Sequence, residues 1–390
     1  MKRVYGSPKN LMVSEEDEDS TVKCRERRRR RMAMRRMAGI AAGAPCSSVV
    51  VGEDERQKLA ARTPSDKPTS STPAAAIMSL ISIMETPPPP VYGMMSVVGR
   101  QREMEDEVSV HTNLCRPEIN GFRPVHFFGV FDGHGGRHVS ALCKENMHVI
   151  MEEELMGIKL TGDESDGGDG GGELWKKAIK RSFQRMDDMS MRLCLCGGLS
   201  SSSNICRCNP KLSFIGSTAV VSILTKEQIF VANCGDSRAV LCRNGRAIPL
   251  SVDHKPDRED ERARIESCGG RIMFADGARV EGILAMSRAI GDRLLKQWVT
   301  SEPEISVTRR EAGDECLIVA SDGLWDVLSS ELACKIVHEC LGENQEPRIE
   351  ANEGAAAGSS SDAAATLLIR LALGRRSTDN ISVIIIDLRN

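Results

Sequence analysis

Acidic residues stand at the ends of the apolar, strand-like segments of this chain, and this placement constrains its fold more than any other feature. Asp132 follows the apolar run HFFGVF, and Asp322 follows CLIVAS. The same kind of placement is seen at four further acids, which are Glu105, Asp106, Asp236 and Asp379. A carboxylate at the end of a buried strand is partly desolvated, which is costly unless the group is paired or bound to a metal. The pattern therefore predicts strands whose ends converge on a cation.

The segment DGHGG, which begins at Asp132, is the strongest of these signals. It places a carboxylate, the backbone carbonyl of Gly133 and the imidazole of His134 side by side. Oxygen ligands favour hard cations such as Mg²⁺ or Mn²⁺, and histidine is suited to proton transfer near neutral pH. Any one of the acids, taken alone, could equally be a turn or capping residue. Their number and placement together favour a metal site.

Strands in meanders alternate with helices along the rest of the chain. Strand patterns lie at 125–131, 218–224, 228–233, 238–243, 246–250, 315–320 and 381–387. Helix patterns lie at 137–155, 173–191, 257–268, 330–341 and 364–373. Asp257 is the expected N-cap of the third helix, and Gly269-Gly270 its expected stop. The order of the segments favours an α+β fold of stacked, mainly antiparallel sheets flanked by helices over a doubly wound parallel sheet.

The first 90 residues differ in composition from the remainder. They hold an arginine-rich run within residues 23–36 and a Pro-, Ser- and Thr-rich stretch that ends in Pro87–Pro90. Such segments do not pack into a core. We therefore expect a disordered extension at 1–90 and a catalytic domain at 91–390, with surface insertions near 157–172, 194–210 and 342–363.

Several features bear on where the chain acts. The basic run favours a nuclear localisation signal over a merely solvated tail, and the net charge of −3 argues against a nucleic-acid-binding protein as a whole. The longest N-terminal apolar stretch, 74–84, is too short to cross a bilayer. Without an apolar region after Met1 we expect no secretory signal, and the 14 cysteines are expected to be reduced. These features predict a soluble monomer of nucleus and cytoplasm, without specific nucleic-acid binding or membrane binding.

Other candidate sites carry weaker signals. A zinc site could be formed by four cysteines, but their spacing matches no common zinc motif. These four are Cys194, Cys196, Cys206 and Cys208. Structural roles, rather than chemistry, are expected for His126, His138, Asp253, His254 and Trp325.

Seven motifs, taken in order, resemble those of the type 2C, or PPM, protein phosphatases over residues 92–388. They are EMED at 103–106, FDGHGG at 131–136, GSTA at 216–219, NCGDSRAVL at 233–241, SRAIGD at 287–292, ASDGLWDV at 320–327 and DNISV at 379–383. The resemblance implies a four-layer αββα sandwich with a two-metal centre at one end of the sheets. It also implies hydrolysis of phosphoserine and phosphothreonine in proteins.

The direct ligands follow from the resemblance, motif by motif. Asp132 would bridge two Mg²⁺ or Mn²⁺ ions, and Gly133 would add its backbone carbonyl. Asp322 and Asp379 would complete the protein ligands. Two such ions lower the pKa of a bridging water and stabilise both the attacking and the leaving oxygen of an in-line displacement.

The resemblance also implies roles for four neighbours of these ligands. Glu105 and Asp106 would hold metal-bound waters, and Asp236, together with Asp322, would fit a weaker third ion. His134 would be the general acid that protonates the leaving serine or threonine oxygen.

One departure from the family pattern falls beside the substrate phosphate. Family members usually carry an arginine three residues before the Met of EMED, where it contacts the phosphate, and this chain has Gln101 there. Arg100 and Arg102 flank it and, on a strand, would point to the opposite face. Glutamine is a poor replacement for the planar guanidinium fork in bidentate phosphate binding. Weakened substrate binding is therefore a hypothesis for this chain.

Further motifs indicate a branch of the family. GARVEGILAMSRAIGD at 277–292, SEPEI at 301–305 and the arginine-rich segment resemble the plant group A phosphatases, which negatively regulate abscisic acid signalling. Members dephosphorylate Snf1-related kinases, and most are inhibited by hormone-bound receptors through a Trp shortly before the GAR motif. That position falls on Ala275 here, as in the subtype named for abscisic-acid-hypersensitive germination. The resemblance implies weak or no receptor binding and a role in seed germination or dormancy, unless the neighbouring Phe274 partly substitutes for the Trp.

Two other functions compete with an active phosphatase. Gln101 favours a catalytically weak scaffold that binds and occludes a kinase. The basic run favours nucleic-acid binding, which would be non-specific and salt-sensitive. All the positions of direct metal ligands are filled by suitable residues, and His134 is present. An active phosphatase is therefore the prediction.

Overall fold

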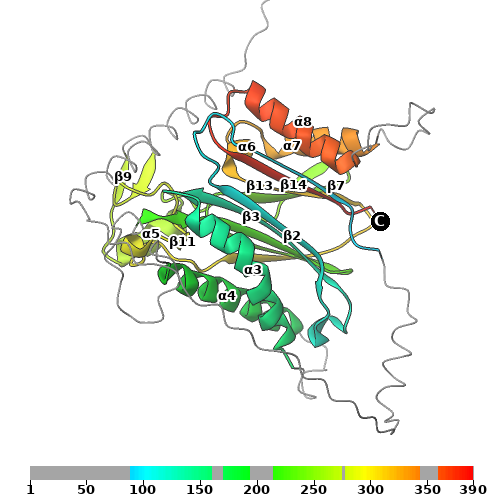
Figure 1. Ribbon diagram of the computed structural model, residues 1–390, viewed down its shortest axis with the longest axis horizontal. Helices are drawn as coiled ribbons and strands as arrows, with labels where there is room; N and C mark the ends of the chain where they lie inside the picture. Colours follow the sequence, from blue (N-terminus) through cyan, green and yellow to red (C-terminus); the bar gives the residue numbers. More distant parts are fainter. Residues whose placement is uncertain (1–87, 160–169, 194–213, 275–276, 343–358, 390) are drawn as a thin grey trace, which may run out of the picture. The chain divides into compact units, whose positions relative to one another are not determined.

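Two antiparallel sheets stack face to face, with helices on both outer faces (Figure 1). The computed structural model describes residues 88–159, 170–193, 214–274, 277–342 and 359–389. One sheet contains, in spatial order, β1 (Tyr92–Val97), β14 (Ile381–Asp387), β13 (Asp314–Ala320), β7 (Arg238–Arg243) and β8 (Arg246–Pro249). The other contains β11 (Ile290–Gly291), β4 (Gly216–Ser217), β3 (Val125–His134), β5 (Ala219–Leu224), β6 (Gln228–Cys234) and β12 (Glu304–Arg309), with β2 (Asp106–Cys115) paired to β3.

The helices complete a sandwich of four layers. Helices α3 (His138–Met156) and α4 (Gly170–Met191) pack on the seven-stranded sheet. Helices α7 (Ser330–Gly342) and α8 (Ser360–Gly374) pack on the five-stranded sheet, next to the short helix α6 (Asp322–Trp325). Figure 1 shows the two helix pairs on opposite sides of the stacked sheets. The expected αββα architecture is confirmed.

The central strands are buried on both faces because their sequences are apolar without interruption. All ten residues of β3 are buried. Successive side chains of a strand point to opposite faces, so Phe127 and Phe131 pack toward α3 and α4, whereas Phe128 and Val130 fill the layer between the sheets. Strand β14 alternates in the same way between α8 and the middle layer. These two strands lead directly to the acidic motifs.

Every strand and helix expected from the sequence is present, and the errors lie at helix ends. Helix α8 begins four residues before the expected start at 364, because Ser359 and Asp362 form a capping box. In α5 (Glu259–Ser267) the N-cap position is Arg258, so the expected N-cap at Asp257 is wrong. Three acids in the first turn of α5 offset the helix dipole without a side-chain cap. The expected C-terminal end of this helix at Gly269-Gly270 is confirmed, since α5 ends at Ser267 and the Gly270 N–H donates to the Ile265 carbonyl at 2.9 Å.

Several elements escaped prediction. Strand β2 mixes charged and polar residues with apolar ones, and its pairing with β3 is irregular between His111 and Cys115. The alternation of apolar and polar residues that marks a strand is therefore weak in β2. The others are too short to show an alternation of buried and exposed positions, apart from the six-residue strands β1 and β12, whose outer positions in the sheets leave them partly exposed.

Parts of the expected domain organisation lie outside the described residues. These are the arginine-rich run, the expected insertion at 194–210 and most of the other two insertions. The last residues of the insertions expected at 157–172 and 342–363 belong to helices, since α4 begins at Gly170 and α8 at Ser360. In the described ranges, no helix is both long enough and apolar enough to cross a membrane.

Residues 252–303, which link β8 to β12, form a segment with a small core of their own. It contains α5, β9 (Ile272–Phe274), β10 (Ala278–Val280), β11 and a short 3₁₀ helix at Arg293–Leu295. Ile265, Leu284 and Val299 are among the buried residues of its core. Through β11 this segment also pairs with β4 and so reaches the seven-stranded sheet.

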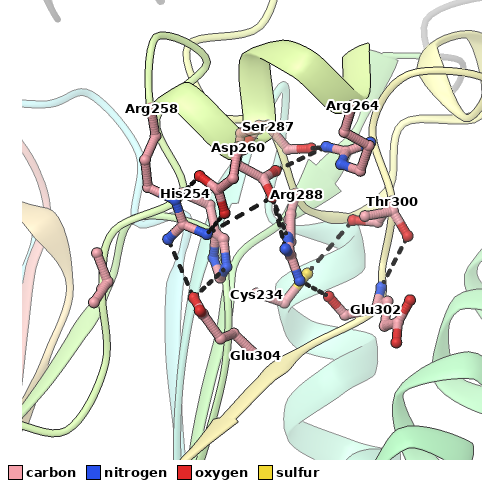
Figure 2. Close-up of polar contacts among 12 residues, drawn as sticks. Cys234, His254, Arg258, Asp260, Arg264, Ser287, Arg288, Thr300, Glu302 and Glu304 are labelled. Atoms are coloured by element: carbon pink, nitrogen blue, oxygen red, sulfur yellow. Dashed lines mark hydrogen bonds and ion pairs between the residues drawn. The ribbon is translucent and has the colours of Figure 1, made fainter. Parts of the chain in front are cut away.

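A charged network centred on Glu261, whose side chain is 1% exposed, holds this segment together. Figure 2 shows its partners Arg264 and Arg288. Glu261 accepts hydrogen bonds from Arg288 at 2.6 and 3.0 Å and from Arg264 at 2.8 Å. Arg258 and His254 both contact Glu304, at the start of β12. Burial alone would raise the pKa of Glu261, but the hydrogen bonds from the two arginines outweigh it and hold the pKa well below its usual range.

We predict that Glu261→Gln lowers the free energy of unfolding at pH 7 by on the order of 3 kcal/mol, because it leaves buried guanidinium groups without their counter-charge. The depressed pKa means that this stabilisation is complete above the unfolded-state pKa of about 4.3 and fades as the pH falls below it. Urea unfolding at pH 7 and at lower pH measures both effects.

The matched control is Glu266→Gln, on the exposed side of the same helix, where Glu266 pairs with Arg262. This change should cost no more than about 0.5 kcal/mol. Equal losses for the two variants would contradict the role given to Glu261.

Candidate functional site

Two carboxylates face each other at the ends of β2 and β3. Asp106 stands opposite Asp132 in the antiparallel register, and the two residues are 1% and 3% exposed. Residues directly opposite on neighbouring strands have their Cβ atoms roughly 5 Å apart on one face, and like charges there are destabilising. A cation at this edge of the sheet would offset the repulsion.

The GSTA motif fixes the backbone of Asp132. The Asp132 N–H donates to Thr218 Oγ1 at 3.1 Å, and its carbonyl accepts from the Thr218 N–H at 2.9 Å. The Thr218 hydroxyl also lies 2.8 Å from the Ser237 hydroxyl, beside Asp236. The hydroxyl of this motif therefore holds one acid in place from the next strand.

Gly133 has to be glycine. A Cβ atom at this position would lie 2.5 Å from the Glu105 carbonyl oxygen and 2.7 Å from Ser140 Oγ. Its N–H donates to the same Glu105 carbonyl at 3.1 Å. The close approach brings the Glu105 backbone against the last residues of β3.

The second sheet contributes its acids through Ser321 and Asn380. Ser321 Oγ donates to Asp106 Oδ2 at 2.8 Å and accepts from the Ser382 N–H at 3.0 Å. It thus joins the two sheets, and the next residue is Asp322, the first of α6.

Asn380 links the preceding acid, Asp379, to the segment before β2. Its Oδ1 accepts from the Glu105 N–H at 2.7 Å, and its Nδ2 donates to the carbonyls of Val98 and Glu103. Asp379 Oδ1 accepts from the Asn380 N–H at 2.6 Å. The structure therefore brings together five of the predicted residues, which are Glu105, Asp106, Asp132, Asp322 and Asp379.

The sixth acid, Asp236, is buried and has a partner that the sequence did not reveal. Lys255 Nζ forms an ion pair with Asp236 Oδ2. Lys255 lies in a loop to which no chemistry was assigned, 19 residues from Asp236. No local pattern in the sequence connects the two residues.

His134 likewise has an unforeseen partner. Its Nε2 lies 2.7 Å from Asp292 Oδ2, and both side chains are buried. Asp292 closes the SRAIGD motif, but nothing in the motif marks it as the neighbour of a histidine 158 residues away.

The residues expected near the phosphate do not lie on a strand. Strand β1 ends at Val97, and the Gln101 N–H donates to the Val98 carbonyl in a turn. The alternation that a strand would impose on Arg100, Gln101 and Arg102 therefore does not apply, because these residues follow the end of β1. Both arginines are exposed, and Gln101 is half-buried.

The structural interpretations of two residues are confirmed. The His126 Nδ1 accepts from the Asn113 N–H at 3.0 Å. Burial, and then the charges of Arg310 and Arg116, lower the pKa of His126 to about 4. Trp325 is buried and donates from Nε1 to the Ala320 carbonyl.

Other predicted positions add little to the site. Asp253 pairs with Arg238, and His254 lies between Gly235 and Glu304. His138 is the first residue of α3. Ala275 and the four cysteines of the Cys-x-Cys pairs lie outside the described residues.

The donor set suits a hard divalent cation. It consists of buried carboxylates and a strand-end carbonyl, which are the oxygen ligands that Mg²⁺ and Mn²⁺ prefer. Within the described ranges, no group of three or more His, Cys, Asp or Glu side chains is arranged so that it could hold a metal ion as it stands.

Comparison with known sequences identifies the family of this chain. The family model of protein phosphatase 2C matches residues 91–381. Probable protein phosphatase 2C 75 of Arabidopsis thaliana is 50% identical over 404 residues, which cover 96% of each chain. Probable protein phosphatase 2C 9 of Oryza sativa subsp. japonica is 44% identical and covers 87% of this chain and 85% of its own.

Solved structures confirm the fold. A serine-threonine phosphatase 2C from Toxoplasma gondii has a TM-score of 0.59 at 23% identity and covers 77% of this chain and 96% of its own. A sex-determining protein of C. elegans has a TM-score of 0.60 at 22% identity and covers 81% and 71%. The extent of the family match, which contains six of the seven motifs and the start of the seventh, shows that this chain belongs to the metal-dependent protein phosphatase 2C family and is a serine/threonine phosphatase.

Proposed function

We propose that the acids gathered at the ends of β2, β3 and β14 hold the divalent ions of this phosphatase. The observation that carries the proposal is the opposition of Asp106 and Asp132, with Ser321 joining Asp106 to the second sheet. The proposed direct ligands of two ions per subunit are Asp132, the carbonyl of Gly133, Asp322 and Asp379. Glu105 and Asp106 are proposed to hold waters of the ions.

A weaker third ion is proposed between Asp236 and Asp322. The ion pair with Lys255 supports a low affinity at this position, because an ion must compete with the ammonium group for Asp236. Asp236 is buried, so its charge needs one partner or the other.

The chain's own residues position the reacting groups. When bound, Mg²⁺ or Mn²⁺ supplies an activated water and neutralises charge on the phosphoryl oxygens. The Thr218 hydroxyl holds the backbone of Asp132, and the Asn380 N–H holds the Asp379 carboxylate, so that these acids keep their places during turnover. His134, at the end of β3, is proposed to give a proton to the leaving serine or threonine oxygen.

We predict metal-dependent release of phosphate from a phosphothreonine peptide. Asp132→Asn should reduce it at least about 100-fold, because metal ions supply several kcal/mol of transition-state stabilisation. Chelation should abolish it, and Mg²⁺ or Mn²⁺ should restore it. Asp260→Asn, which alters an exposed carboxylate on α5, is the matched control and should keep full activity.

The competing proposal is a catalytically weak scaffold that occludes a kinase, and the same assay decides between them. If the unaltered protein releases phosphate no faster than Asp132→Asn, the active-enzyme proposal is refuted. Gln101, in place of the usual phosphate-binding arginine, would then be the first residue to test, since Gln101→Arg should lower the KM.

We further propose a role in abscisic acid signalling, as a negative regulator that dephosphorylates Snf1-related kinases during germination or dormancy. The support is the resemblance of 277–292 and 301–305 to the group A phosphatases. Ala275 at the position of the receptor-contacting Trp supports weak or no inhibition by hormone receptors. Phe274, on β9, is 66% exposed and is the residue that could act in its place.

We predict that a saturating hormone-bound receptor leaves phosphatase activity unchanged, because alanine offers neither an indole donor nor a large contact area. Ala275→Trp should confer inhibition, measured with the same phosphothreonine peptide. Inhibition of the unaltered enzyme would refute this proposal. If Phe274→Ala then removed that inhibition, Phe274 would be the substitute contact.

The proposed state is a monomer in nucleus and cytoplasm, with the arginine-rich run as the import signal. Deleting residues 23–37 from a fluorescent fusion should abolish nuclear accumulation without changing retention on DNA in cell extracts. An unchanged distribution between nucleus and cytoplasm would contradict the assignment of the run.

A further inference from the structure

His134 and Asp292 form a buried pair that nothing described so far requires. His134 ends β3, whereas Asp292 lies just after β11, in the 252–303 segment. Their Nε2 and Oδ2 atoms are 2.7 Å apart, and the residues are 3% and 1% exposed. This short contact joins two buried side chains that come from distant parts of the chain.

The backbone at Asp292 is held in an uncommon conformation. Its φ is 50° and its ψ is 49°, in the left-handed region that few residues other than glycine adopt. Its N–H donates to the Ile215 carbonyl at 2.9 Å, and its own carbonyl accepts from the Leu295 N–H at 2.8 Å. Aspartate and asparagine tolerate this conformation better than most residues, so the position combines an uncommon backbone with a side chain that can hold a proton donor.

Gly216 leaves room for the pair. On β4 it is paired with His134 on one side and with Gly291 on the other, so three strands bring the two side chains together. A Cβ atom at Gly216 would lie 2.3 Å from Asp292 Oδ2 and 2.5 Å from His134 Nε2. Any side chain there would displace the contact.

From this geometry we infer that Asp292 is a positioning residue for the general acid. Its carboxylate accepts the Nε2–H of His134 and so fixes both the orientation of the ring and its tautomer. This inference rests on the proposed role of His134 in the phosphatase reaction.

The alternative is that Asp292 is only a structural partner for a buried imidazole. Two substrates that differ in their leaving groups distinguish these roles. A serine or threonine alkoxide is a poor leaving group and needs a proton, whereas para-nitrophenolate leaves without one. If Asp292 positions the general acid, its substitution should lower kcat only on the serine or threonine phosphoester. If its role is only structural, substitution should lower the activity on both substrates equally.

The test compares kcat and KM of the full chain, with Mg²⁺ or Mn²⁺, on a phosphothreonine peptide and on para-nitrophenyl phosphate. Asp292→Asn should lower kcat on the peptide by about 100-fold or more, with KM unchanged, and change kcat on para-nitrophenyl phosphate by less than about threefold. Asp292→Gly suits the left-handed backbone and should give the same pattern, which guards against a folding defect in one variant.

Two further variants complete the design. His134→Gln should reproduce the selective loss. Asp187→Asn is the matched control, because Asp187 supports the same loop through the Gly291 N–H and Lys296; any loss there should be equal on both substrates. If His134→Gln is selective but the Asp292 variants lose both activities in parallel, or neither, the positioning role is overturned. If His134→Gln itself is not selective, the proposed general acid fails, and this inference fails with it.

Discussion

The repulsion between Asp106 and Asp132, which face each other across hydrogen-bonded strands, is the constraint around which the rest of this structure is arranged. Two buried carboxylates on one face of a sheet are unfavourable neighbours. The fold nevertheless places further acids beside them, at the start of α6 and just before β14. A sandwich of two sheets is well suited to this, because strand ends from both sheets meet at one edge and neither sheet alone would supply all the acids.

The groups that hold these acids in place are mostly neutral. Hydroxyl groups of Thr218 and Ser321 and the amide of Asn380 fix the positions of the neighbouring acids without cancelling their charge. Asp236 additionally forms an ion pair with Lys255, with which an ion at this position would have to compete.

Much of the fold and most of the acids could be predicted from the sequence, because the strands that carry them are long, apolar and bounded by Gly or Asn. Strand β2 could not be predicted, because its polar residues weaken the alternation of apolar and polar positions that marks a strand. The partners Lys255 and Asp292 escaped prediction for another reason: each contact joins residues far apart in the chain, and no local spacing records it. The strand alternation considered for Arg100 and Arg102 does not apply, because β1 ends at Val97 and a turn follows.

The burial of β3 and β14 on both faces has a consequence for how the molecule opens. Amide groups in strands covered on both sides exchange their hydrogens with solvent only when much of the surrounding structure is lost. Fraying of outer helices, or loosening of the 252–303 segment, would leave these two strands intact. The acids at their ends, Asp132 and Asp379, therefore keep their places through such partial openings.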